Sequence, residues 1–167
     1  SLKRLDKNLL SKIFKLKKTH YKFSFSSQKI WFKNNIQKLD KHLILFNNKD
    51  VIGYNVLRFR KINFNYPKSN ISNNAYIFDT IIIKNEYRSL GLSKIIMNKS
   101  ISIIKKKKYI SFLVCKKKMI EFYKYFNWKI IPDQKISINN FKKANRHVWM
   151  YYGKKINIKK IKKIKII

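Results

Sequence analysis

The sequence predicts an α/β fold of the α+β type, in which a mixed, mostly antiparallel sheet of about six or seven strands is flanked by about four helices. Apolar residues recur at helical spacing in four segments, short apolar runs bounded by polar residues lie between them, and a strand, helix and strand follow one another at the centre of the chain. The 167 residues, 45% of them hydrophobic, suit a domain with a sizeable core.

Two helices are expected at the start of the chain. Leucines and an isoleucine recur at helical spacing between residues 2 and 16, and the Lys17-Lys18 pair suits the end of that helix. Ser26 or Ser27 is expected to cap the second helix, because a serine hydroxyl there accepts a backbone N–H that the helix leaves unpaired. This second helix carries the apolar residues Trp31, Phe32, Ile36 and Leu39.

Three antiparallel strands are expected next. Residues 42–46 and 51–59 are strand-like runs separated by four polar residues, which is typical of a hairpin. Residues 63–74 contain a proline and several asparagines, so we expect a loop or a hairpin tip. They lead into a strand over residues 75–83, which reads as buried on both faces and is interrupted by one carboxylate, Asp79.

The centre of the chain predicts a parallel pair of strands. Residues 92–104 give a helix one apolar face, and the lysines at 105–108 suit the negative end of its dipole. Residues 109–114 are a short apolar run. A strand, a helix and a second strand in this order favour parallel pairing with a right-handed crossover.

The remaining elements close the sheet. Residues 117–126 carry apolar side chains at i, i+3, i+4 and i+7, which predicts a compact helix. Residues 128–131 and 147–152 are expected to pair as closing strands around a loop that contains Pro132 and Asn139-Asn140.

The domain organisation follows from what the chain lacks. No repeat and no linker rich in Gly, Ser or Pro divides the sequence, so we expect a single domain over residues 1–153. Residues 154–167 alternate Lys with Ile and are expected to form a C-terminal tail. The tail either frays or adds a strand or helix at the edge.

The formal charge of +34 is a weak argument for a nucleic-acid partner. Of 41 basic residues only five are arginine, and the chain is also rich in Ile, Asn, Tyr and Phe, which A/T-rich codons encode. A biased genome would produce this composition without selection for polyanion binding. Arginine is the residue favoured for bidentate contacts to phosphates and bases, so its scarcity counts against sequence-specific readout.

Other classes of site are also disfavoured. Cys115 is the only cysteine, which excludes an intramolecular disulfide and a thiolate metal site, and we expect it to be a small buried residue. The three histidines are scattered without nearby carboxylates, so no metal is expected. No run of 18 apolar residues and no secretory signal is present, so we expect no membrane partner and a cytoplasmic location.

The most informative segment joins the 75–83 strand to the following helix. It reads Arg88-Ser89-Leu90-Gly91-Leu92-Ser93. A loop that enters a helix N-terminus leaves several N–H groups unpaired, and the helix dipole adds positive charge there, so this join suits a phosphate. Gly91 has no Cβ to obstruct a ligand. An ordinary strand-to-helix turn is the alternative interpretation.

This segment resembles motif A of the GNAT superfamily of acyl-CoA N-acyltransferases, which reads Arg or Gln, two residues, Gly, one residue, then Gly or Ala. Ser93 departs from the usual last residue but is nearly as small. A second match follows at residues 122–128, which resemble the family's aromatic-Tyr-x-x-x-Gly-Phe segment, with Asn127 in place of Gly. Asn is the best substitute where a helix end needs a left-handed residue. The predicted element order over residues 42–152 is also that of the family.

The resemblance implies an acetyl-CoA-dependent N-acetyltransferase and a set of binding residues. The pyrophosphate would bind the backbone amides of the segment formed by Arg88, Ser89, Leu90, Gly91, Leu92 and Ser93. The strand end formed by Ile81, Ile82 and Ile83 would hold the pantetheine arm, with the Ile81 or Ile83 amide polarising the thioester. Lys116 stands where the family often has an Asn that contacts this arm. Tyr123 matches the family's general acid, with core packing as the alternative.

Asp79 is the second candidate catalytic residue. It lies four residues before Ile83, where some aminoglycoside-acetylating relatives supply a base, and burial raises a carboxylate's pKa and suits it to accept a proton. The alternatives are a hydrogen bond to a neighbouring strand or an ion pair with a lysine.

The acceptor is not fixed by the sequence. A primary amine of a small molecule, such as an amino sugar or an aminoglycoside, is the leading expectation, and a protein N-terminus or lysine is an alternative. A non-enzymatic basic protein that binds RNA or ribosomes is the rival from another class. Acidic or phosphorylated acceptors would be attracted by the basic chain. A homodimer is also possible.

Overall fold

The computed structural model describes residues 5–132, 136–138, 147–153, 156–157 and 160–166, and the chain falls into two compact units. Unit 1 comprises Ser1–Arg58 and Asp79–Ser102, and unit 2 comprises Phe59–Phe78 and Ile103–Ile167. Two long strands and one helix contribute residues to both units.

Unit 1 begins with two short helices, each capped by a side chain. Helix α1 follows Asp6, whose carboxylate accepts the Leu9 amide at 2.7 Å. Helix α2 follows Ser24, whose hydroxyl accepts the Ser27 amide at 3.1 Å. The predicted cap at Ser26 or Ser27 is therefore wrong by two or three residues, since Ser27 lies in the first turn. The elements of unit 1 are α1 (Lys7–Lys18), α2 (Phe25–Asn35), β1 (Lys41–Asn47), the start of β2 (Asp50–Asn65), the end of β3 (Asn70–Ile83), a 3₁₀ turn (Asn85–Tyr87) and most of α3 (Leu92–Lys106).

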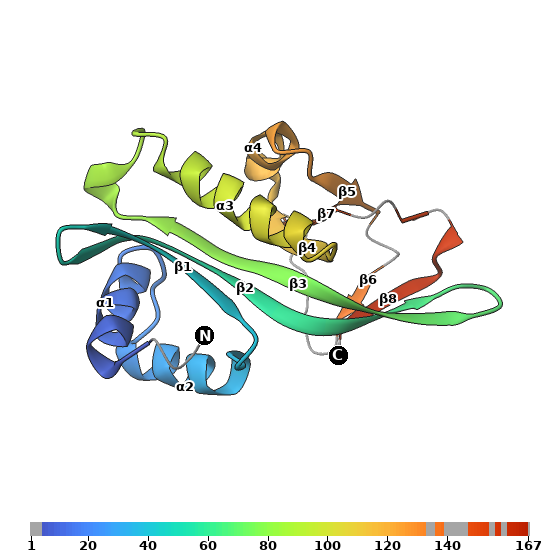
Figure 1. Ribbon diagram of the computed structural model, residues 1–167, viewed down its shortest axis with the longest axis horizontal. Helices are drawn as coiled ribbons and strands as arrows, with labels where there is room; N and C mark the ends of the chain where they lie inside the picture. The colour runs from blue at the N-terminus through green and yellow to red at the C-terminus, as the bar shows by residue number, and fades with distance from the viewer. Residues whose placement is uncertain (1–4, 133–135, 139–146, 154–155, 158–159, 167) are drawn as a thin grey trace. The chain divides into compact units, whose positions relative to one another are not determined.

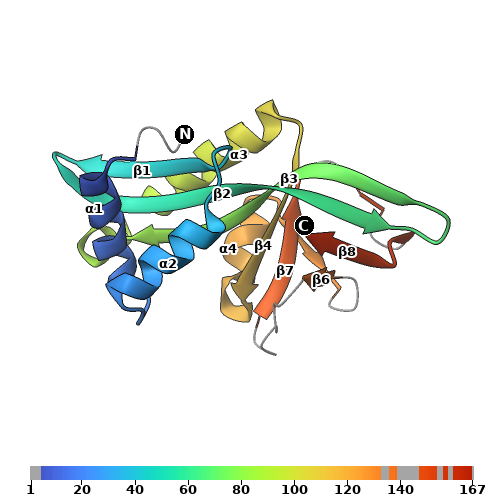
Figure 2. The same cartoon turned by 90° about the horizontal axis from the view of Figure 1, so that it is seen from below.

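The strands of unit 1 are covered by helices on both faces (Figures 1 and 2). Strands β1 and β2 form the predicted antiparallel hairpin. Helices α1 and α2 pack on one face, where Ile13 and Phe14 join Phe32 and Tyr54 in an apolar cluster. Helix α3 covers the opposite face, and a Cβ at Gly53 would lie 3.2 Å from its Ile96. The lack of a side chain at Gly53 therefore allows close packing of helix on strand.

Unit 2 is built on a sheet with the strand order β5-β7-β4-β3-β2-β8-β6. Strands β2 and β3 meet at a tight tip in which the Tyr66 amide donates to the Ser69 carbonyl at 2.8 Å. Strand β4 pairs parallel to β3 through Ala75–Ile77, as the strand, helix and strand order predicted, and antiparallel to β7 over six residues. The remaining elements are β4 (Ile110–Lys116), a 3₁₀ turn (Lys117–Met119), α4 (Ile120–Tyr125), β5 (Lys129–Ile131), β6 (Ile136–Ile138), β7 (His147–Tyr152) and β8 (Lys163–Ile166).

The predicted fold class is confirmed, with four α-helices and a mostly antiparallel sheet in the described part of the chain. Among the residues that the structure describes, the sheet has eight strands, because the short β6 and β8 add to those expected. Strands β5 and β7 pair as the predicted closing strands. The predicted loop residues Asn139-Asn140 lie outside the described residues.

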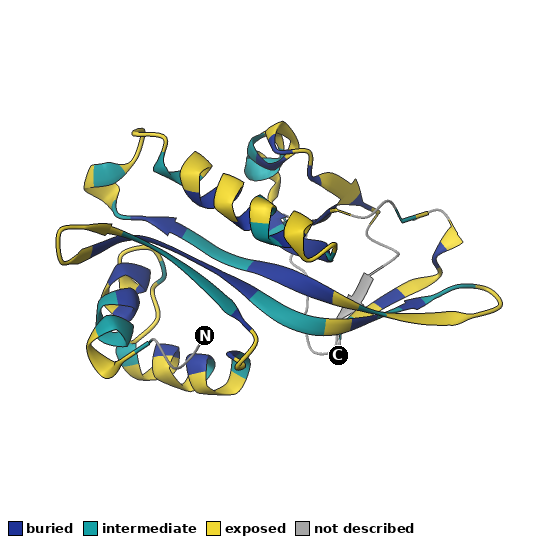
Figure 3. Cartoon of the chain, viewed as in Figure 1, coloured by how far each residue is buried: buried dark blue, intermediate teal, exposed yellow. Residues whose placement is uncertain are grey.

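The Lys/Ile-rich C-terminal segment contributes to the core of unit 2. Its strand β8 lies between β2 and β6. Of the three alternatives for this segment, a frayed tail, a strand or a helix, the strand is therefore the one observed. Ile161 and Ile164 are fully buried in one cluster with Phe64, Phe112 and Trp149. Lys163 and Lys165 are exposed, so the Lys/Ile alternation is the period-2 pattern of a half-buried strand (Figure 3). A domain boundary at residue 153 stays a prediction.

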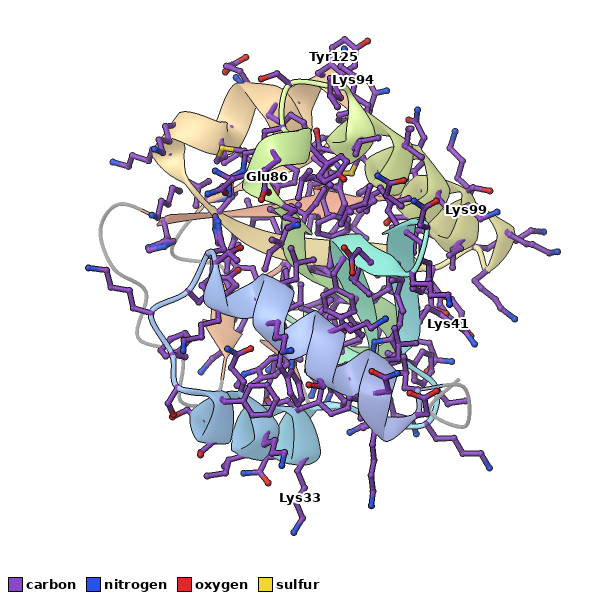
Figure 4. All side chains as sticks on the ribbon, turned by 90° about the vertical axis from the view of Figure 1, so that its left-hand side faces the viewer. Lys33, Lys41, Glu86, Lys94, Lys99 and Tyr125 are labelled. Atoms are coloured by element: carbon purple, nitrogen blue, oxygen red, sulfur yellow. The ribbon has the colours of Figure 1, made fainter. Side chains whose placement is uncertain are left out.

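Most described lysines are surface residues. The side chains of Lys33 on α2 and Lys99 on α3 extend from the ribbon into solvent (Figure 4). Lys17 is an exception, since only 6% of it is exposed. Cys115 is also buried, as expected, and burial raises the pKa of its thiol to about 11.

None of the helices described is long and apolar enough to cross a membrane. Within the described ranges, no group of three or more His, Cys, Asp or Glu side chains is placed to hold a metal ion.

Candidate functional site

The end of β3 contains a backbone distortion at Thr80. This residue has φ of +59°, in the left-handed region that β-branched residues rarely adopt. Such a conformation costs about 1–3 kcal/mol and persists only where the surroundings hold it. The distortion lies directly after Asp79, in the segment that the sequence marked as a candidate site.

A buried polar pair holds this distortion in place. Asn55 of β2 and Ser100 of α3 are both fully buried. The Asn55 amide donates to the Asp79 carbonyl at 3.1 Å and approaches the Thr80 carbonyl at 3.4 Å. The Ser100 hydroxyl lies 3.1 Å from the Asn55 side-chain oxygen and 2.8 Å from the Ile96 carbonyl. The Asn55 amide thus satisfies carbonyls that the distorted strand turns away from a regular ladder, and Ser100 supports the Asn55 side chain from α3.

Both oxygens of the Asp79 carboxylate have partners. Its Oδ2 lies 2.9 Å from Nε of Arg58 in an ion pair, and its Oδ1 accepts a hydrogen bond from the Thr80 hydroxyl at 2.9 Å. A quarter of the Asp79 side chain remains exposed. The sequence alternative of an ion pair is therefore observed, with an arginine in place of a lysine. The catalytic role of Asp79 stays a prediction.

Three residues from the α1–α2 region surround this ion pair. The Lys17 Nζ lies 4.3 Å from the centre of the Trp31 ring, and the Arg58 guanidinium carbon lies 5.5 Å from it. Burial lowers the pKa of Lys17, an effect that Asp79 opposes and Arg58 reinforces. The Tyr21 hydroxyl makes a side-chain hydrogen bond with Thr80, and burial raises the pKa of Tyr21. We call Lys17, Tyr21, Trp31, Arg58 and Asp79 the charged cluster.

A buried histidine lies elsewhere in unit 1. His42 Nδ1 and the Tyr54 hydroxyl are 2.8 Å apart, and the two rings stack with centroids 6.0 Å apart. Burial lowers the pKa of His42 to about 4, although Asp40 opposes this. His42 is therefore a neutral imidazole near pH 7.

The predicted phosphate loop begins after the 3₁₀ turn and ends in α3. Ser89 and Gly91 have φ of +64° and +73°, and Gly91 is the residue whose carbonyl accepts the amides of Lys94 and Ile95. Gly91 is thus the N-cap, and the Leu92 and Ser93 amides occupy the first turn, where no carbonyl of the helix can accept them. Nothing lies within 4 Å of a Cβ built on Gly91, so there is free space beside the loop.

Arg88 anchors this loop to the end of β3. Its Nε donates to the Ile83 carbonyl at 3.2 Å, and its own amide donates to the Asn85 carbonyl at 3.1 Å. The Arg88 amide is therefore engaged within the turn. The candidate donors to a phosphate begin at Ser89.

The end of β3 is largely buried and lies beyond the residues of β3 that pair with β4. Ile82 and Ile83 are buried, and Ile81 is intermediate. The parallel ladder with β4 covers Ala75–Ile77 of β3, and the chain continues beyond it through these isoleucines. Just after them, the Lys84 amide donates to the Ile52 carbonyl at 2.8 Å.

The other two predicted site residues belong to unit 2. Tyr123 on α4 is 6% exposed and packs edge-to-face on Phe78 and Trp128, with ring centroids 6.2 Å apart in each pair. Asn127, two residues after the end of α4, has φ of +63°, which confirms the left-handed conformation expected there. Lys116 is exposed at the end of β4. Core packing of Tyr123 is therefore observed, and its role as an acid stays a prediction.

Unit 1 brings together Asp79, the isoleucine strand end and the phosphate loop, all predicted from the sequence. Sequence reasoning missed Lys17, Tyr21, Trp31, Arg58 and Asn55 as residues of the site. Two of them left a signal: Lys17 follows the apolar positions of α1, and Asn55 is an amide within the apolar run of β2. Tyr21 left none that we can identify, because its contact with Thr80 depends on the tertiary fold.

No family model matches the sequence, and no curated protein matches it. Solved structures do match. An aminoglycoside 6'-N-acetyltransferase complexed with coenzyme A has a TM-score of 0.65 at 10% identity, over 90% of this chain and 93% of that one. The ribosomal-protein-S18-alanine N-acetyltransferase of Escherichia coli has a TM-score of 0.63 at 11% identity, over 89% of this chain and 90% of that one. An acetyltransferase of the GNAT family from Staphylococcus aureus Mu50 has a TM-score of 0.61 at 14% identity, over 89% of this chain and 94% of that one.

The chain has the GNAT fold. The element order predicted for this fold is confirmed, including the phosphate-loop helix between two parallel strands. At identities of 10–14% the likeness extends to the fold and not to a particular acceptor.

Proposed function

We propose that this GNAT-fold chain is an acetyl-CoA-dependent N-acetyltransferase that acts on a primary amine. The observation that carries the proposal is the loop from Ser89 to Ser93. It has two left-handed residues, opens onto the first turn of α3, and has free space beside Gly91. Amides in this arrangement, together with the helix dipole, bind a phosphate group.

The proposed chemistry divides into binding and proton transfer. The pyrophosphate binds the amides from Ser89 to Ser93, and the Ile81 or Ile83 amide polarises the thioester carbonyl. The neutral amine attacks the carbonyl carbon, the bond from carbon to sulfur breaks, and Tyr123 protonates the departing thiolate. Asp79 binds the amine and takes up the proton that it loses.

A small-molecule amine, such as that of an amino sugar or an aminoglycoside, is the proposed acceptor class. One neighbour in fold is named as an aminoglycoside acetyltransferase, which supports this class. Another neighbour in fold is named as a ribosomal-protein-S18-alanine N-acetyltransferase, so a protein N-terminus is the second candidate for the acceptor.

Substitution of Gly91 tests the phosphate loop. Gly91→Asn fills the free space and tolerates the left-handed conformation, so the loop should keep its shape. We expect CoA to bind roughly ten- to a hundredfold more weakly by calorimetry, which corresponds to about 1.4–2.8 kcal/mol. Lys108→Asn is the matched control, because Lys108 is also exposed and left-handed but lies outside the loop, so CoA affinity should be unchanged. Unchanged CoA affinity in a folded Gly91→Asn protein would contradict the assignment.

Turnover is tested by thiol release from acetyl-CoA with a panel of amines. Tyr123→Phe keeps the ring that packs on Phe78 and Trp128, so the thermal midpoint should hold while turnover falls about ten- to a thousandfold. Full turnover in this variant would exclude Tyr123 as the acid.

A further inference from the structure

The charged cluster holds more positive than negative charge at a largely buried place. Lys17 is 94% buried, and in the part of the chain that the structure describes no carboxylate forms an ion pair with its ammonium group. Its observed partner is the face of Trp31 at 4.3 Å. A cation–π contact contributes about 0.5–2 kcal/mol, less than the several kcal/mol that removing an ion from water costs.

The one carboxylate of the cluster already has a cationic partner. Asp79 Oδ2 lies 2.9 Å from the Arg58 Nε, while Lys17 acts on Asp79 only at longer range. Two cations therefore share one carboxylate beside a single indole ring. A buried cation without its own counter-charge is the state that an anionic ligand would relieve.

We propose that the acceptor carries an oxyanion near its amine, a carboxylate or a phosphate, and that Lys17 and Arg58 bind this group beside Trp31. This inference rests on the proposed function and narrows its acceptor class. The amine of such a molecule faces Asp79, and its oxyanion faces the two cations. A cluster of one carboxylate, one ammonium, one guanidinium and an indole ring is thus complementary to a molecule that carries both charges.

The chemistry of the two cations supports an oxyanion over other ligands. A guanidinium presents five N–H donors in a planar fork, so Arg58 keeps donors on its terminal nitrogens after its Nε contacts Asp79. Lys17 adds a compact charge that suits carboxylate and phosphate alike. The same charges repel an acceptor that carries only amines, so unmodified aminoglycosides and polyamines are disfavoured.

Matched pairs of amines test the proposal by direct binding. We would titrate D-glucosamine 6-phosphate against D-glucosamine, and alanine against alaninamide, into the full chain with and without CoA. Calorimetry should show at least one anionic member, meaning the molecule of a pair that carries the oxyanion, binding about tenfold or more tightly than its partner without the oxyanion, equivalent to about 1.4 kcal/mol. The two pairs separate a phosphate from a carboxylate as the recognised group.

Variants at neighbouring lysines distinguish a site from general attraction to a basic surface. Lys17→Gln and Lys18→Gln remove the same charge from adjacent residues of α1, of which Lys18 is exposed. Lys17→Gln should abolish the preference for the anionic member, and Lys18→Gln should retain it. Lys17→Arg keeps the charge and should retain most of the preference, which excludes misfolding as the cause of the loss. Thermal midpoints confirm that each variant is folded.

Two results would overturn the inference: no preference for either anionic member, or a preference that Lys17→Gln and Lys18→Gln reduce equally. Measuring thiol release from acetyl-CoA with the same amines distinguishes failure of the oxyanion site from failure of the proposed acetyltransferase function. Acetyl transfer to the amines that lack the oxyanion, with no preference for those that carry it, leaves the function intact and refutes the oxyanion site. Absence of both CoA binding and thiol release refutes the function, and the titration without CoA still decides the oxyanion site.

Discussion

Replacing Asn55 with leucine should destabilise the chain more than any surface change, because Asn55 supports the distortion in β3. Leucine has the same number and branching of side-chain heavy atoms with bulkier methyl groups, so the change removes hydrogen bonds without leaving a cavity. The lost bonds are those from the Asn55 amide to the Asp79 carbonyl at 3.1 Å and from the Ser100 hydroxyl to the Asn55 oxygen at 3.1 Å. The contact with the Thr80 carbonyl, at 3.4 Å, is weaker.

The magnitude follows from what each group loses. A buried carbonyl left without a donor costs about 1–3 kcal/mol, whereas Ser100 keeps its bond to the Ile96 carbonyl and loses about 0.5–1.5 kcal/mol. Relaxation of Thr80 out of its left-handed conformation returns part of the ~1–3 kcal/mol stored there. We expect a net loss of about 2–3 kcal/mol, which lowers the thermal midpoint by roughly 5–10 °C for a chain of this size.

Urea denaturation of the parent and of Asn55→Leu, Ser100→Ala and the double variant measures this effect. Because Asn55 and Ser100 share a hydrogen bond, their losses should be non-additive by about 0.5–1 kcal/mol or more. The m-values should agree, so that midpoints report stability alone. A loss below about 0.5 kcal/mol for Asn55→Leu, or full additivity of the pair, would show that the distortion does not depend on this contact.

Two further predictions concern other parts of the fold. The pKa of His42 is about 4 in the folded chain and about 6.5 in the unfolded chain, so the unfolded state binds more protons between these two pH values. The contribution of His42 to the free energy of unfolding is therefore complete above about pH 6.5. It falls by up to about 3 kcal/mol as the pH drops towards 4. Urea denaturation at pH 7.5 and 4.5 should show a smaller fall in His42→Gln, and equal falls in both proteins would refute this role. Ile164→Ala should cost about 2–4 kcal/mol because the side chain is fully buried, whereas exposed Lys165→Ala should stay within about 0.5 kcal/mol. Equal stability of these two variants would contradict the packing of β8.

The sequence predicted what depends on local pattern. The hairpin, the parallel crossover and the closing strands follow from periodicity, and all are confirmed. Asn127 was expected to be left-handed because it ends a helix where a glycine is usual, and its φ is +63°. The cap of α2 was placed wrongly because residues 24, 26 and 27 are all serines, and the choice among them depends on which hydroxyl reaches an amide.

The sequence did not predict which side chains meet. The partner of Asp79 is Arg58, which lies on a different strand, and Lys17 approaches them from a helix far away in the chain. The place of Lys17 after the apolar positions of α1 indicates that it is buried, but in a chain with 36 lysines it does not show which charges lie near it. Such pairings follow only from the register of strands and the packing of helices on them.

The lack of a side chain has different consequences at Gly153 and Gly91. Asparagine occupies the left-handed positions Asn48 and Asn127, so a positive φ does not by itself require glycine in this chain. At Gly153 a Cβ would lie 2.6 Å from the Tyr109 carbonyl. Gly91 has no such neighbour, and its φ of +73° is one that asparagine tolerates. No contact within the described residues therefore requires glycine at position 91, and the missing side chain leaves the backbone of the loop open to a ligand.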